Sequence, residues 1–171
     1  MTRARMTPCL AAILVLALPF PAAAQSTLGA AIPQPTREGV LALADRYIAE
    51  ATPQLTFEEQ TSIDGVLRTL ASQRTVPAIQ AQSIDELLNL CTLQLASTDG
   101  LASVIVLSAN LVKLAPENAR TSNLLGAVLH AIGRNREAIA AFEYARTLAP
   151  KSELVMLNAA NTYLDLDEDD K

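Results

Sequence analysis

A three-residue sequence recurs at a fixed distance in the C-terminal half of the chain. Leu114-Ala115-Pro116 returns as Leu148-Ala149-Pro150, so the two prolines lie 34 residues apart. A period near this length is typical of folds that stack pairs of antiparallel helices, in which each pair buries its apolar face against the next. The recurrence therefore predicts paired helices in this half of the chain.

The rest of the sequence also carries the apolar spacing of helices. Apolar residues recur three or four positions apart in the segments between turn residues. No segment shows the two-residue alternation or the clustered β-branched residues of strands. We therefore predict an all-α fold of short antiparallel helices. About seven are expected, beginning at or just after Thr36, Thr56, Ser83, Leu101, Asn118, Asn135 and Ser152.

Two of these helix starts match the capping box. In this motif a Ser or Thr side chain and a Glu side chain three residues later bond each other's backbone amides. Thr56 with Glu59 is one example, and Ser83 with Glu86 is the other. Both pairs therefore predict the start of a helix, and the polar residues 72–77 are expected to separate the two helices.

The N-terminus has the three parts of a secretory signal peptide. Basic Arg3 and Arg5 precede an apolar run at 10–18, and the small residues Ala22-Ala23-Ala24 follow it. A retained membrane anchor is the alternative, but the run is shorter than the roughly 20 residues that span a bilayer. We therefore expect residues 1–24 to be removed by cleavage after Ala24. The mature protein would then be periplasmic or secreted and have no membrane span.

The remaining chain divides into three parts by composition. Residues 25–35 combine small residues, proline and polar residues without a period, and are expected to be a flexible leader. Residues 36–82 are expected to hold two helices, as an N-terminal cap or a degenerate repeat, because they lack a match at the 34-residue period. Residues 83–171 are expected to hold the repeats, a terminal helix and an acidic tail.

The charge of the chain argues against two classes of partner. The formal net charge is −5, and removal of Arg3 and Arg5 with the signal peptide makes the mature protein more acidic. Nucleic acid and anionic lipid are both bound by basic surfaces. We therefore expect neither as a partner.

Cys91 is the single cysteine of the expected mature protein, because Cys9 precedes the cleavage site. A lone thiol in an exported protein can be reactive or can pair with a second molecule. Leu87, Leu88 and Leu95 surround Cys91 at helical spacing, which favours burial instead.

Residues 119–152 resemble one full tetratricopeptide repeat. The small residues Gly126 and Ala138 would let the backbones of the two helices approach closely, and Phe142 would fill the wedge between this pair and the next. Ser122 departs from the family pattern, in which a bulky aromatic residue is usual. The residues that carry the resemblance, and hence the expected repeat core, are Leu125, Gly126, Leu129, Ala138, Phe142, Ala145 and Pro150.

The resemblance implies a protein–protein interaction scaffold in the cell envelope. In this family the first helix of each pair lines a concave groove that holds a peptide or a helix of a partner protein. An amide such as that of Asn123 can bond a peptide backbone, and Arg120 can pair with a carboxylate. The alternative is an ordinary solvated surface. The positions of this sequence that match the groove positions of the family are Arg120, Asn123, Ala127, His130, Leu154, Leu157 and Asn161.

The last predicted helix is apolar on nearly every side. We predict that it caps the repeats, because repeat arrays need a terminal element that shields the final apolar face. The alternative is a missing neighbour, which would be a bound partner, a second copy of the chain in a homodimer, or the next part of a longer protein. The apolar residues are Leu154, Val155, Met156, Leu157 and Leu164.

No catalytic or cofactor motif is recognisable in the sequence. His130 is the only histidine, so neither a nucleophile–base pair nor the usual zinc ligand set can be placed. The acidic end at 165–170 lacks the loop glycine and distal glutamate of a calcium hand. We therefore predict no enzymatic activity, no cofactor and no metal. A self-associating structural module and a truncated part of a longer tetratricopeptide protein are the main alternatives to the scaffold, and a cryptic enzyme is the least favoured.

Overall fold

The computed structural model describes residues 33–75, 77–94 and 100–169, and every regular element in these ranges is helical. The all-α prediction is therefore confirmed for this part of the chain. The expected signal peptide and most of the expected leader lie outside the described residues. Short 3-10 turns at Thr52–Gln54 and Gln73–Thr75 follow the first two helices. The α-helices are α1 (Arg37–Ala51), α2 (Phe57–Ser72), α3 (Pro77–Gln94), α4 (Leu101–Leu114), α5 (Ala119–Ala131), α6 (Asn135–Leu148) and α7 (Glu153–Asp169).

One of the two predicted capping boxes is confirmed and the other is wrong. The Thr56 amide donates to Glu59 Oε2 at 2.8 Å, and the Glu59 amide donates to Thr56 Oγ1 at 3.2 Å. Ser83, by contrast, lies inside α3, which begins at Pro77. Proline is favoured in the first turn of a helix, because its fixed φ suits the helix and its missing N–H would be unpaired there. The predicted break at 72–77 is thus shorter than expected.

The last two helices begin at or just after the predicted residues, Asn135 and Ser152. The cap of α6 is Arg134, and Asn135 is the first helical residue. The Asn135 side chain lies 3.1 Å from His130 Nδ1 instead. The last helix continues to Asp169. The terminal helix and the acidic tail, which we expected as separate parts, therefore share one helical segment.

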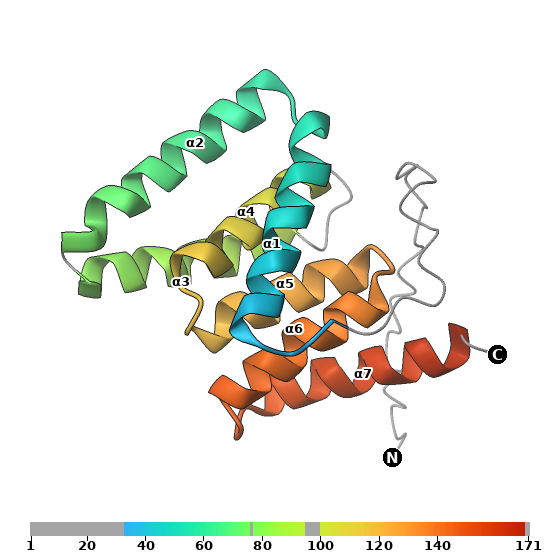
Figure 1. Ribbon diagram of the computed structural model, residues 1–171. Helices are drawn as coiled ribbons and strands as arrows, with labels where there is room; N and C mark the ends of the chain where they lie inside the picture. The colour runs from blue at the N-terminus through green and yellow to red at the C-terminus, as the bar shows by residue number, and fades with distance from the viewer. Residues whose placement is uncertain (1–32, 76, 95–99, 170–171) are drawn as a thin grey trace, which may run out of the picture. The chain divides into compact units, whose positions relative to one another are not determined.

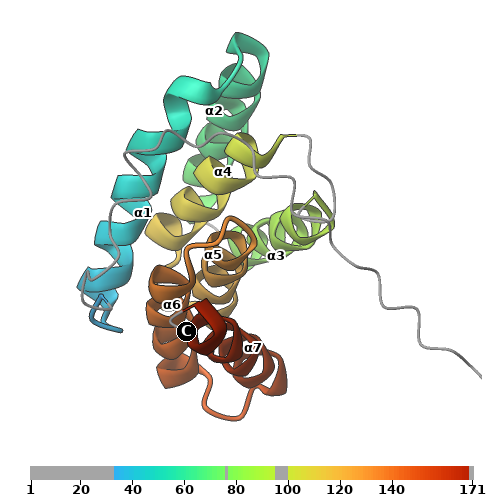
Figure 2. The same cartoon turned by 90° about the vertical axis from the view of Figure 1, so that its right-hand side faces the viewer.

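The C-terminal helices pack in chain order around a shared core. Helix α4 contacts α5, α5 lies along α6, and α6 lies along α7 (Figures 1 and 2). Phe142 of α6 is 1% exposed, and a Cβ atom built on Gly126 of α5 would lie 2.7 Å from its ring. The expected close approach at Gly126 is therefore present, with Phe142 covering the glycine of its own helix pair. Leu125, Leu129, Ala138 and Ala145 are fully buried, while Pro150 is exposed in the turn after α6.

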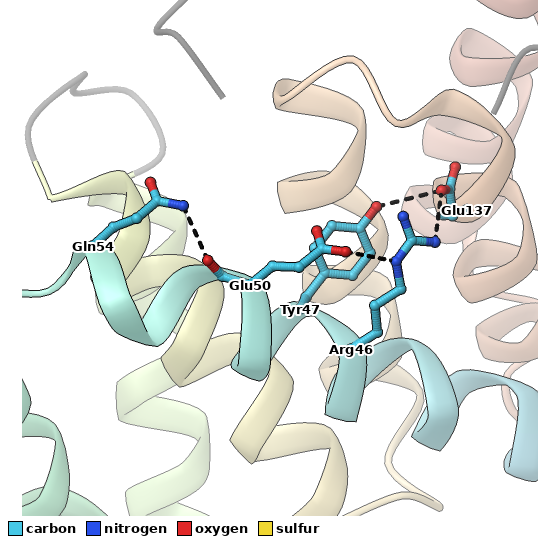
Figure 3. A network of polar contacts seen from close by, with 5 residues as sticks. All are labelled: Arg46, Tyr47, Glu50, Gln54 and Glu137. Atoms are coloured by element: carbon cyan, nitrogen blue, oxygen red, sulfur yellow. Dashed lines mark hydrogen bonds and ion pairs between the residues drawn. The ribbon is translucent and has the colours of Figure 1, made fainter. Parts of the chain in front are cut away.

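Helix α1 packs against α4 and also reaches α6. A polar network joins it to α6 (Figure 3). Arg46 donates to Glu50 Oε1 at 2.8 Å and lies 3.4 Å from Glu137 Oε1, which also accepts from the Tyr47 hydroxyl at 3.4 Å. Tyr47 is fully buried, and this burial raises its pKa well above the usual range. The network joins α1 to α6, a contact that the sequence did not predict.

Two buried serines allow a matched stability test. Ser122 Oγ is buried and has no hydrogen-bond partner among the described residues, whereas the equally buried Ser108 donates to the Ile105 carbonyl at 3.0 Å. An unpaired buried hydroxyl costs about 1–3 kcal/mol, and a satisfied one contributes about 1 kcal/mol. We expect Ser122→Ala to raise the free energy of unfolding by about 1 kcal/mol and Ser108→Ala to lower it by about 1 kcal/mol. Urea denaturation measures both changes, and equal losses would contradict the difference between the two sites.

Candidate functional site

Helices α5 and α7 carry the residues that the sequence analysis assigned to a binding groove. None of these residues is buried, and four of the seven are exposed. The two helices contact each other, and Asn158 Nδ2 of α7 donates to Asn123 Oδ1 of α5 at 3.0 Å. The expected surface is therefore continuous across α5 and α7. The exposed positions are Arg120, Leu154, Leu157 and Asn161, and the half-buried ones are Asn123, Ala127 and His130.

The polar groups of this surface are already engaged within the fold. Arg120 donates to Asp85 at 2.5 Å and to Asn89 at 3.0 Å, both on α3. The Asn123 carbonyl oxygen accepts the bond from Asn158. Arg120 thus joins α5 to α3, and Asn123 joins α5 to α7. The roles expected for them, binding a partner's carboxylate or backbone, would require these internal bonds to open.

His130 is half-buried where α5, α6 and α7 meet. Its Nδ1 atom lies 3.1 Å from Asn135 Oδ1 and 3.3 Å from Thr162 Oγ1. Its Nε2 atom lies 3.4 Å from Asp165 Oδ2. The imidazole therefore connects α5, α6 and α7. In the described ranges, no group of three or more His, Cys, Asp or Glu side chains is placed to hold a metal ion.

The apolar side chains of α7 are the most exposed part of the site. Leu154, Leu157 and Leu164 are 61%, 58% and 65% exposed, and helical spacing places them in one stripe along α7. On the opposite side of the helix, Val155 and Ala159 are buried in the core. We predicted that α7 is apolar on nearly every side, but Leu164 was not among the predicted groove residues. Helical spacing from Leu157 would have been enough to find it.

Cys91 is buried in α3, as its leucine neighbours predicted. Burial raises the pKa of its thiol to about 11, so the protonated form dominates at neutral pH. Thiolate is the nucleophilic form of cysteine. Neither a reactive thiol nor an intermolecular disulfide is therefore favoured at this position.

Comparison of the chain with protein-family models, with curated protein sequences and with solved structures gives no match. Within the described helices, none has both the length and the apolar character needed to cross a bilayer. The class of protein defined by the fold is an all-helical one with a 34-residue sequence recurrence. Its candidate site is the surface shared by α5 and α7.

Proposed function

We propose that this protein is an exported interaction scaffold that holds a segment of a partner protein against α5 and α7. The observation that carries the proposal is the exposed stripe of Leu154, Leu157 and Leu164. A row of large apolar side chains on a surface helix typically marks a protein interaction site. Leucines spaced along one helix suit an amphipathic helix or an extended segment as the ligand.

The contacts between alternate helices support a tetratricopeptide-like arrangement. Arg120 of α5 bonds Asp85 of α3, and Asn158 of α7 bonds Asn123 of α5. Both bonds join residues 35 positions apart. The polar contact thus recurs with nearly the same spacing as the sequence triplet. In this proposal α3, α5 and α7 are the first helices of successive pairs and line the groove.

The charges beside the leucine stripe indicate the chemistry of the partner. Glu153 and Asp165 are exposed near the two ends of the stripe. Arg120, the nearby cation on α5, is paired with Asp85. Complementary charges flanking an apolar contact favour the correct partner and speed its association. We propose a partner segment whose apolar side chains repeat at helical spacing and are flanked by Lys or Arg. Binding, with no catalytic step, is the proposed activity.

Photo-crosslinking in cells tests the proposal. A photo-reactive amino acid in place of Leu157 is expected to give a discrete crosslinked product with a second protein. The matched control carries the photo-reactive amino acid in place of Phe57, a residue of α2 that is 84% exposed. We expect no crosslinked product from this control. Leu154→Asp should weaken binding by roughly thirty-fold, because charging a central apolar contact costs about 2 kcal/mol. Equal crosslinking from positions 157 and 57 would contradict the groove, as would a yield unaffected by Leu154→Asp.

A further inference from the structure

The leucine stripe and Asn161 together follow the spacing of a coiled-coil seam. The exposed residues concerned, separated by three, four and three positions, are Leu154, Leu157, Asn161 and Leu164. Helices that pair side by side repeat their apolar residues at alternating intervals of three and four. The row is about 15 Å long, because a helix rises about 1.5 Å per residue. These four residues, which we call the α7 seam, therefore have the spacing to receive one further helix.

One flank of the α7 seam lies against α5. Asn158 and Asp165 each directly follow a leucine of the seam in the sequence. Asn158 donates to Asn123 of α5 at 3.0 Å, and Asp165 Oδ2 lies 3.4 Å from His130 Nε2 of the same helix. These contacts hold α5 directly beside the seam. A ligand that lies on the seam would therefore touch α5 as well as α7, as the proposed groove requires.

A helix suits the α7 seam better than an extended segment does. The backbone N–H and C=O groups of an extended segment need hydrogen-bond partners, and burying these groups unpaired is unfavourable. Leucine side chains offer no such partner, and Asn161 is the only one of the four seam residues with a polar side chain. A helix pairs its backbone groups internally. It can therefore cover the three leucines without leaving its backbone unpaired.

We propose that the α7 seam binds a helix of the partner protein, and that this helix carries an amide side chain, from Asn or Gln, opposite Asn161. The inference rests on the proposed function, because the seam is the apolar part of the same groove. An asparagine within a seam of leucines fixes the register of the paired helices, at a cost in stability. A leucine opposite Asn161 would leave the amide without a partner once water is excluded. The binding of such a helix should therefore be about tenfold weaker.

Acidic side chains lie on both flanks of the α7 seam. Asp165 lies on the flank beside α5, Glu153 lies on the other flank, and both are exposed. Paired helices select their partners by the charges at these flanking positions. The partner helix should therefore carry Lys or Arg on both sides of its own apolar row. Helix α7 contains no lysine or arginine, so a second copy of it could not supply these charges.

Mapping of crosslink sites on the partner tests for a bound helix. The photo-reactive amino acid replaces Leu157 in one full-length protein and Leu164 in another, and mass spectrometry locates the attachment site on the partner. These positions are seven residues apart on α7, which is about 10 Å. Sites on a bound helix should also be about seven residues apart, whereas an extended segment, rising about 3.3 Å per residue, would give about three. A separation near three would overturn the bound helix and leave the groove intact, whereas no product from either position would contradict the groove itself.

Substitution of Asn161 tests the polar contact. With the photo-reactive amino acid at position 157, Asn161→Leu is expected to lower the crosslinked yield about tenfold. Asn161→Gln should keep most of the yield, because glutamine retains the amide. Gln60→Leu, at an exposed position of α2, is the matched control, since it adds the same apolar side chain away from the seam and should leave the yield unchanged. An unchanged or higher yield from Asn161→Leu would overturn the polar contact, because an apolar side chain opposite position 161 would favour leucine there.

Discussion

Phe142→Ala is expected to lower the free energy of unfolding by about 3–5 kcal/mol, the usual cost of truncating a fully buried aromatic side chain. Phe142 is 1% exposed, and its ring lies directly on Gly126, which has no side chain to move into the space left behind. The cavity would therefore remain largely open. Urea denaturation followed by circular dichroism measures the loss.

Phe57→Ala is the matched control for this prediction. Phe57 is 84% exposed at the start of α2, so the same chemical change removes little buried surface. We expect the control to change the free energy of unfolding by less than about 0.5 kcal/mol. If the two variants lost similar stability, the contact between α5 and α6 would not be the main support of the C-terminal core.

The pairing of α5 with α6 could be predicted from the sequence because its determinants are local. Gly126 and Phe142 lie within one 34-residue period, and the turn at Gly133 keeps their helices adjacent. Gly133 has a φ of +74°, a conformation that glycine adopts without steric cost. Short connections between neighbouring helices make such contacts readable from spacing alone.

The position of α1 could not be predicted in the same way. Its contact with α6 joins Tyr47 to Glu137, which are 90 residues apart in the sequence. No periodic pattern in the sequence predicts a contact between these two residues. The apolar spacing of α1 predicts a buried face but does not identify the helix that covers it. Contacts of this kind depend on the tertiary arrangement and leave no local signal.

The candidate site was predictable in its apolar part and less so in its polar part. The resemblance to the repeat family placed Leu154 and Leu157 in the predicted groove, and both are exposed. The same resemblance placed Arg120 in the groove but could not show that Asp85 would pair with it. Asp85 lies on α3, outside the residues 119–152 that carry the resemblance to the repeat. Partner choice for a charged side chain therefore required the structure.

Gly126→Ala is expected to lower the free energy of unfolding by about 2 kcal/mol, although alanine is the better helix former by about 1 kcal/mol. The added Cβ atom would lie 2.7 Å from two ring carbons of Phe142, well inside the usual contact distance of about 3.5–4.0 Å. Phe142 is buried, so its ring has little space in which to withdraw. Steric overlap should therefore outweigh the gain in helix propensity.

Gly65→Ala separates the two contributions. Gly65 lies in the middle of α2, and a Cβ atom there would meet nothing within 4 Å. Without overlap, the same substitution should raise the free energy of unfolding by about 0.5–1 kcal/mol. A double-mutant cycle then tests the cause: in the Phe142→Ala protein, Gly126→Ala should also become stabilising, because the ring that opposes the methyl group is gone. If Gly126→Ala remained equally destabilising without the ring, close approach of α5 to α6 through Phe142 would not be the reason for glycine at this position.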